Sequence, residues 1–433
     1  MNIPRDPALD NSLALLREGY NFVGNRCRRY GADVFETRLM LRNAVCAMGE
    51  DAARMFYHPG RFTRKMAMPP TAAMLLQDMG SAMMRDGEAH RVRKQMFLSV
   101  LQPGNVQRLV SIAERHWLAR IDEWRRRDHV VLQEEAEHIL CAAACEWAGV
   151  PLTEAGAAQR THEFAMMIDG AGSVGPRSWK AMTLRSRNED WMRSVVESVR
   201  AGYFAVPPGC AIDAVVSHRE ADGSMLDTKV AAVEIINLLR PTVAVARYIT
   251  FSALALHDHP ESREWLAAGD EDRLECFVQE VRRFYPFFPL IGGNVIEPFD
   301  WRGRHFAKGD WVLLDMFGTN HDPRIWEEPQ RFLPERFRRW NGSAYNFIPQ
   351  GGGDVQFTHR CPGEATTIEL TKMAVRMLTM SMRYQVPRQD LRISLSRMPA
   401  IPASRFIIRD VGRGMSASHP PAATLAAARS HTA

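Results

Sequence analysis

The sequence lacks the cysteine pattern of a disulfide scaffold or a zinc site. Its seven cysteines are an odd number, and no two of them have the CxxC spacing of zinc sites and redox motifs. A disulfide scaffold or a structural zinc site is therefore not expected. Free thiols favour a reducing compartment.

Long apolar runs are also missing. No window reaches the length that a membrane span requires. The first residues include Pro4, Arg5 and Asp6, where a signal peptide would carry its apolar core. We therefore expect a cytoplasmic protein without a transmembrane segment.

The chain contains no basic block or stripe. The net charge is +5 for 433 residues, and basic residues usually stand beside acidic ones. This pattern argues against a nucleic-acid partner. Apolar residues make up 46% of the chain, which is enough for a large buried core and argues against disorder in the body of the chain.

Strand-like segments are few, whereas helical periodicity is common. Helices are predicted over 104–126, 130–148, 156–169, 228–256, 260–284 and 362–383. The short strand candidates are 130–133, 292–297, 311–316 and 404–410. The pattern predicts a mainly α fold with a minor β region. We expect one domain over residues 1–411 and a disordered tail over 412–433, which is rich in Ala, Ser, Pro and Gly.

Cys361 lies in the most informative stretch, FIPQGGGDVQFTHRCPGEATTIEL (347–370). A glycine-rich loop precedes it, and Pro362 suits the first turn of a helix. At a helix N-terminus, free N–H groups and the helix dipole stabilise a thiolate, which is the form that binds a metal. A buried structural cysteine beside an ordinary loop is the alternative reading.

Two further motifs stand before this cysteine. Glu280 and Arg283 form an ExxR pair in a predicted helix, and Arg336 lies in FLPERF (332–337). The order ExxR, PERF, cysteine loop resembles the cytochrome P450 family. The resemblance implies a helical prism with a minor β region, haem b and Cys361 as the iron ligand. It makes Glu280, Arg283 and Arg336 a buried structural network.

The cysteine loop departs from the usual family signature, FxxGx[RH]xCxG. Asp354 and Phe357 stand where the signature has Phe and Gly, although His359 keeps the basic position. The longer loop, PQGGG (349–353) followed by six residues and RCPGE (360–364), resembles the fatty-acid peroxygenase branch. In that branch Gly is usual at Thr358. The resemblance implies hydrogen peroxide as the oxidant.

The apolar stretch 228–256 lacks the acid–alcohol pair of ordinary P450 monooxygenases and carries Arg240-Pro241-Thr242 instead. Pro241 removes a backbone N–H and kinks a helix. A cation in an apolar helix is costly unless an anion meets it, and a guanidinium matches a carboxylate. Arg240 could instead snorkel to the surface. By resemblance, Arg240 and Pro241 are catalytic residues that bind the fatty-acid carboxylate, which then serves as acid and base.

Other positions match the branch. His90 and Lys94, four residues apart on one helical face, are predicted to bind the haem propionates, with Arg64 and His359 as further cofactor-binding candidates. For Arg64, His90 and Lys94, a solvated surface cation is the alternative.

The predicted substrate-lining residues are Met83, Phe287, Phe288 and Leu290. Plain core packing is equally consistent with the last three. Branch members commonly have Gln or His where this chain has Met83, and Met neither donates nor accepts a proton. A shift of one residue would place Ala82 or Met84 there.

The sequence therefore predicts an enzyme that oxidises long- or medium-chain fatty acids at carbon 2 or 3 with hydrogen peroxide, and that decarboxylates them to terminal alkenes as a further outcome. No redox partner is required. The alternatives are a monooxygenase that depends on redox partners, a haem-binding protein without turnover and a helical protein without haem.

Overall fold

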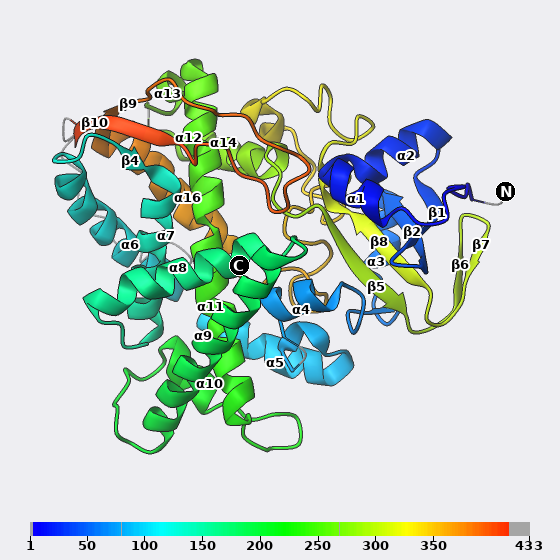
Figure 1. Cartoon of the computed structure of the whole chain (residues 1–433), viewed down its shortest axis with the longest axis horizontal. Helices are drawn as coiled ribbons and strands as arrows, with labels where there is room; N and C mark the ends of the chain where they lie inside the picture. Colours follow the sequence, from blue (N-terminus) through cyan, green and yellow to red (C-terminus); the bar gives the residue numbers. More distant parts are fainter. Residues whose placement is uncertain (1–2, 79, 268, 415–433) are drawn as a thin grey trace, which may run out of the picture.

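The computed structural model describes residues 3–78, 80–267 and 269–414. A helical part makes up most of it, and a sheet region lies at one end of the long axis (Figure 1). The helix pair α11 (Thr228–Ala244) and α12 (Ala246–Asp258) runs through the middle of the helical part.

The remaining helices follow the chain order. They are α1 (Ser12–Glu18), α2 (Phe22–Tyr30), α3 (Glu50–Phe56), α4 (Pro70–Leu76), α5 (Gly87–Val100), α6 (Pro103–Trp124), α7 (Leu132–Ala148), α8 (Glu154–Gly170), α9 (Pro176–Arg200), α10 (Ala211–Val216), α13 (Pro260–Ala267), α14 (Glu271–Phe284), α15 (Met316–Asn320) and α16 (Glu364–Arg376). Short 3₁₀ turns are η1 (Gly19–Asn21), η2 (Ala82–Met84) and η3 (Pro334–Arg338), and a π turn, η4 (Met377–Ser381), follows α16.

The strands form three sheets. They are β1 (Val34–Leu39), β2 (Arg42–Met48), β3 (Phe62–Thr63), β4 (Val130–Val131), β5 (Leu290–Val295), β6 (Phe299–Trp301), β7 (Arg304–Phe306), β8 (Trp311–Asp315), β9 (Met382–Gln385) and β10 (Ile407–Arg413). The largest sheet has the order β1-β2-β8-β5-β3, in which only β2 and β8 are parallel. The second is β4-β10-β9, and β6 and β7 form a hairpin.

Some helix ends agree with local chemistry. Asp227 accepts a hydrogen bond from the Lys229 amide at the start of α11, and Asp270 does the same for Asp272 and Arg273 at the start of α14. Gly149, in the left-handed conformation, ends α7. The predicted mainly α fold is confirmed.

Two predicted helices are interrupted. Residues 260–284 form α13 and α14, because Gly269 (φ +70°) and the cap Asp270 separate them. The stretch 228–256 breaks at Val245, one turn after Pro241, where the Val245 amide bonds the Thr242 carbonyl instead of continuing the α-helical pattern. The helix break therefore lies four residues beyond the proline that the sequence pointed to.

The sheet region contains strands that the sequence pattern did not reveal. β1 and β2 pair over six positions, from Val34 opposite Ala47 to Leu39 opposite Arg42. Charged and polar residues interrupt their apolar alternation, so the pattern is weak without the pairing partner. In the C-terminal region, β10 extends to Arg413, two residues past the predicted domain boundary. Residues 415–433 of the predicted tail lie outside the described residues.

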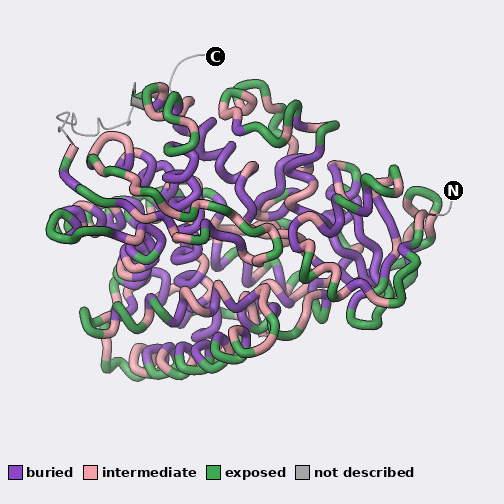
Figure 2. The backbone as a smooth tube through the Cα atoms, turned by 45° about the horizontal axis from the view of Figure 1, so that its top comes forward, coloured by how far each residue is buried: buried purple, intermediate pink, exposed green. Residues whose placement is uncertain are grey.

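The core consists of one large helical cluster and two smaller clusters around the sheet. Buried segments run through the interior of both parts, and exposed segments lie at the outer edges (Figure 2). No helix in the described part of the chain combines the length and apolarity that a bilayer crossing needs.

One buried acid in this core has no cationic partner among the described residues. Glu137 of α7 is buried, and the Gln133 side-chain amide donates to its carboxyl at 2.7 Å. Burial raises the pKa of Glu137 to about 7, although the nearby Arg247 guanidinium acts to lower it. The folded protein therefore holds a proton here that the unfolded chain releases at lower pH.

We expect Glu137 to make stability depend on pH. Because its folded pKa lies above the unfolded value, the folded state is favoured below about pH 4.5 and loses that advantage as the pH rises to about 7. Glu137→Gln should stabilise the protein by a few kcal/mol at pH 8 and by much less at pH 5. Denaturant titrations at both pH values measure this difference. An equal effect at both would contradict it.

Candidate active site

The loop before α16 contains Cys361, and its path depends on two glycines and one backbone hydrogen bond. Gly351 (φ +99°) and Gly353 (φ +78°) adopt angles that favour glycine. A Cβ on Gly353 would lie 2.7 Å from the Thr358 side chain. The Cys361 amide donates to the Gln350 carbonyl at 3.0 Å, which fixes the cysteine against the start of the loop.

Cys361 lies just before α16 rather than in its first turn. The helix begins at Glu364 with Gly363 as its cap, so Pro362 is outside the helix, contrary to the prediction. Burial raises the pKa of the Cys361 thiol, while the Gly363 backbone amide acts to lower it. The Gly363 amide thus acts in the direction expected of a helix end, but burial has the larger effect on the free thiol. A bound metal ion would deprotonate the thiol.

A cluster of charged side chains contacts this loop and holds it in place. Glu364 accepts hydrogen bonds from Arg282 and from Arg360, the latter at 2.6 Å, and Arg282 also donates to the Gln350 side chain at 2.9 Å. Burial alone would raise the pKa of Glu364, yet the two guanidiniums hold it below its usual range. Sequence reasoning did not assign Arg282 or Glu364, although both lie inside the motifs that it used.

Four side chains that carry nitrogen atoms, those of Arg64, His90, Lys94 and His359, lie close to one another near the loop. Arg64, His90 and Lys94 are buried, and the His90 and His359 rings stack with their centroids 4.2 Å apart. Lys94 donates to the carbonyls of Thr358 and Arg360, and Arg64 donates to the Gly292 carbonyl at 2.8 Å. The structure thus brings together all four predicted cofactor-binding residues.

These residues fit a haem. Neither Arg64 nor Lys94 forms an ion pair within the described ranges, and the buried Nε2 atom of His90 has no partner there. Burial lowers the pKa of Lys94 to about 8 and that of His90 to about 4. Buried cations and a ring nitrogen without a partner suit the two propionates of a haem, and Cys361 would bind its iron.

The predicted structural network is also assembled. Arg283 donates two hydrogen bonds to the Glu280 carboxylate, at 2.7 and 2.8 Å, and Arg336 donates a third at 3.3 Å. Glu280 and Arg283 have no exposed surface. The remaining donors of both arginines reach backbone carbonyls in the segment 320–331. The network therefore ties α14 to the chain that leads to the cysteine loop.

Arg240 has a different environment. It is 5% exposed and makes no ion pair with any described residue. Its guanidinium donates to two neutral oxygens, the Leu76 carbonyl and Asn237 Oδ1, and its Nε has no partner. Burial and the nearby Arg185 lower the pKa of Arg240 to about 9, so it remains a cation at neutral pH. The snorkelling alternative is wrong, because the side chain is buried.

Two residues that the sequence did not single out are linked to Arg240, Asn237 by a direct hydrogen bond and Glu234 through Asn237. Glu234 and Asn237 precede it at intervals of three on α11, and the Asn237 amide donates to Glu234 at 3.1 Å. Polar residues at i, i+3 and i+6 of an otherwise apolar helix share a face, and this spacing was the available signal.

The predicted lining residues are not all in one place. Phe287 and Phe288 pack edge to face with ring centroids 4.8 Å apart, and Phe287 also contacts Tyr248 of α12. Leu290 packs instead against the N-terminal cluster around Phe22. Met83 lies in η2 between two buried residues. Contact of these four with a substrate stays a prediction.

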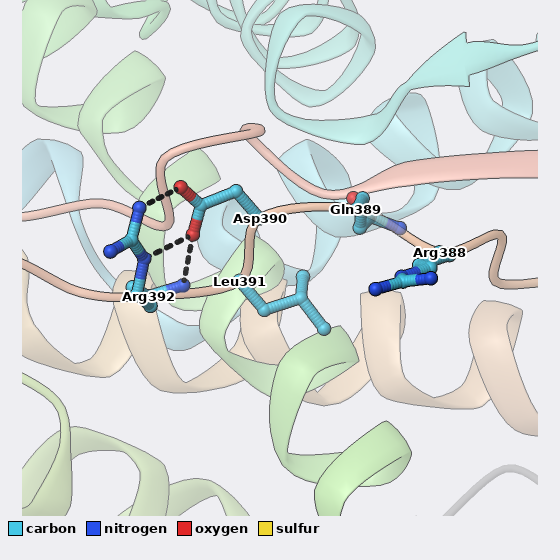
Figure 3. Close-up of a pocket in the computed structure, with 5 residues that line it drawn as sticks. All are labelled: Arg388, Gln389, Asp390, Leu391 and Arg392. Atoms are coloured by element: carbon cyan, nitrogen blue, oxygen red, sulfur yellow. Dashed lines mark hydrogen bonds and ion pairs between the residues drawn. The ribbon is translucent and has the colours of Figure 1, made fainter.

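One surface hollow is formed by other residues. Residues 388–392, between β9 and β10, line a surface hollow of about 750 Å³ (Figure 3). Its Arg392 is paired with Asp390 at 2.6 Å. Arg388 and Gln389 also line the hollow, and it shares no residue with the site around Cys361.

Comparison with known proteins identifies the family. The cytochrome P450 family model matches residues 273–385. The structure of cytochrome P450SP alpha (CYP152B1) in complex with (R)-ibuprophen is 42% identical, with a TM-score of 0.91 over 94% of this chain and 99% of that one. The chain belongs to the cytochrome P450 family.

Two more structures place this P450 in the same branch. Cytochrome P450EX alpha (CYP152N1) with myristic acid is 41% identical, with a TM-score of 0.92 over 96% of this chain and 100% of that one. A cytochrome P450 OleT complex with arachidonic acid is 29% identical, with the same TM-score and coverage. The predicted peroxygenase branch is confirmed, and with it an enzyme whose cofactor is haem and whose oxidant is hydrogen peroxide.

Curated relatives are more distant. Rhazimal synthase of Alstonia scholaris is 28% identical over 177 residues, and the match covers only 34% of that enzyme's length. Putative cytochrome P450 120 of Synechocystis sp. matches along 91% of this chain and 92% of its own, at 22% identity.

The buried network around Glu280 predicts a stability effect. Glu280→Gln keeps the shape but leaves Arg283 and Arg336 without their carboxylate, so we expect a loss of about 3–5 kcal/mol in the free energy of unfolding. Denaturant titration measures it, and the Soret absorbance per protein should fall with it. The control Glu335→Gln changes an exposed residue of the same motif and should stay within about 0.5 kcal/mol. Equal behaviour of the two variants would contradict the prediction.

Proposed function

We propose that this P450 uses hydrogen peroxide to oxidise fatty acids at carbon 2 or 3, with the substrate carboxylate bound by Arg240. The observation that carries the proposal is the buried guanidinium without an acidic partner in the described part of the chain. Such a cation is costly in a protein interior, and a ligand carboxylate would remove the cost.

The donors of Arg240 support a carboxylate rather than a neutral ligand. The protein engages its Nη2 with two neutral oxygens and leaves Nε without a partner. A guanidinium can bind a carboxylate through two parallel N–H groups. Held there by its end, a fatty acid presents only the carbons next to its carboxylate for reaction, so geometry determines the position of oxidation.

The protein offers no acid–alcohol pair after Arg240. The Thr242 hydroxyl donates to the Leu238 carbonyl at 2.8 Å within the helix, so it is already engaged. Haem bound through Cys361 supplies the oxidation chemistry. The carboxylate beside Arg240 is the group that can accept and return a proton, because Pro241 and the apolar residues after it cannot. No redox partner is needed, and loss of the carboxylate as carbon dioxide is a second outcome.

The ligands in the similar structures agree with this proposal. Myristic acid, arachidonic acid and (R)-ibuprophen occur in those proteins, and all three are carboxylic acids. Because those chains share the fold over their whole length, the same ligand class is the expected one for this P450.

Removal of the guanidinium tests the proposal. Arg240→Ala should lower kcat/KM for myristic acid at least about 30-fold, since truncation of one partner of a buried charge pair costs roughly 2 kcal/mol or more. Products are measured by gas chromatography–mass spectrometry after incubation with hydrogen peroxide and no reductase.

Lys229→Ala is the matched control, because it removes an exposed cation from the same helix. It should keep the wild-type rate. Unchanged turnover in Arg240→Ala would overturn the assignment of the carboxylate site. Turnover of the wild type with NAD(P)H and redox partners, but not with peroxide, would favour an ordinary monooxygenase.

A further inference from the structure

Glu234 is a fully buried carboxylate that no part of the proposed reaction uses. It lies on α11 with no exposed surface. Three donors converge on it: the Ala82 amide at 2.7 Å, an Arg93 Nη atom at 2.9 Å and the Asn237 side-chain amide at 3.1 Å. The donors come from η2, α5 and α11 itself.

The Asn237 bond determines the direction of an amide. The Asn237 Nδ2 atom donates to Glu234 and to the Gln77 carbonyl, so its Oδ1 atom faces Arg240, from which it accepts a hydrogen bond at 3.3 Å. A carboxylate can only accept, and Glu234 therefore excludes the flipped amide. The result is a fixed acceptor for Arg240.

The charges are arranged so that this support does not neutralise Arg240. Glu234 is paired with Arg93, and Glu220 lies against the same guanidinium from the segment after α10. The link from Glu234 to Arg240 passes through a neutral amide. Arg240 thus receives orientation from a carboxylate but keeps its positive charge for a ligand.

The Ala82 bond connects the same carboxylate to a second part of the site. Ala82 begins η2, which also contains Met83. Arg93 donates to the Gly80 carbonyl at 2.9 Å, so the segment before this turn is held by the same ion pair. One carboxylate therefore positions both the Arg240 side chain and the backbone of the Met83 turn.

We propose that Glu234 is a positioning residue that sets where the substrate carboxylate lies and hence which carbon is oxidised. The inference rests on the proposed function, because it presumes that Arg240 binds a fatty-acid carboxylate. It adds that regioselectivity depends on a residue that touches neither substrate nor haem. Displacement of a bound substrate by about 1 Å can cost about 100-fold in rate, so a small shift of Arg240 is sufficient.

Glu234→Gln is the test variant. Its amide can present one oxygen to Ala82 and Arg93, but its NH2 group then faces the Asn237 NH2 group, and Asn237 can no longer hold its present orientation. We expect the Kd for myristic acid, from the ferric spin-state titration of the holoenzyme, to rise about tenfold. The ratio of 2-hydroxy to 3-hydroxy product should change at least about threefold.

Glu220→Gln is the matched control. It removes the other carboxylate from Arg93 but leaves the three bonds of Glu234 intact, so Kd and product ratio should stay as in the wild type. Wild-type values of both quantities in Glu234→Gln, even with a lower Tm, would overturn the proposal and leave Glu234 a purely structural residue.

A second variant keeps the test decisive if Glu234→Gln does not fold. Asn237→Ala should raise the Kd and change the product ratio in the same direction. If it does neither, the proposal is overturned. Where both single variants fold, the double variant should raise the Kd no more than the larger single effect, because both substitutions act through one amide. Failure of the wild type to bind or oxidise myristic acid with peroxide would instead overturn the proposed function.

Discussion

The candidate substrate site of this P450 depends on a buried positive charge, that of Arg240, which no described residue neutralises. Most buried arginines in the structure face carboxylates, as Arg93, Arg185 and Arg283 do. Arg240 faces only neutral oxygens. Burial of such a charge opposes folding, and an anionic ligand removes that cost on binding. The proposed affinity for a carboxylate and the free-energy cost of burying Arg240 therefore have the same origin.

The arginines that support the cysteine loop show the opposite arrangement. Arg282 and Arg360 share Glu364, and Arg283 and Arg336 share Glu280, so each guanidinium has an acidic partner. These pairs connect α14, the segment around η3 and the cysteine loop. A fully paired network holds a loop in place but leaves no charge for a ligand. Arginine thus has a supporting role in these networks, whereas the proposed role of Arg240 is recognition of a ligand.

Much of this could be read from the sequence because the informative residues lie close together in the chain. Cys361, the ExxR pair Glu280 and Arg283, and Arg240-Pro241 belong to short motifs, and the longer helices have strong periodicity. The sheet was harder to predict, because β2 pairs with β8, which is more than 260 residues away in the chain. In addition, apolar and polar residues do not alternate regularly in β1 or β2. Helix breaks were also misplaced, because capping by Asp270 and the 3₁₀ turn at Val245 depend on local geometry.

The sequence by itself determined the family, the branch, the iron ligand candidate and the presence of an arginine where an acid–alcohol pair is usual. Only the tertiary structure decided that Arg240 is buried and has no ion-pair partner among the described residues, and that burial raises the pKa of Cys361. It also decided that Glu234 bonds both Asn237 and Ala82. Burial and charge pairing arise from segments far apart in the chain, such as α5, η2 and α11, and no local pattern encodes their meeting.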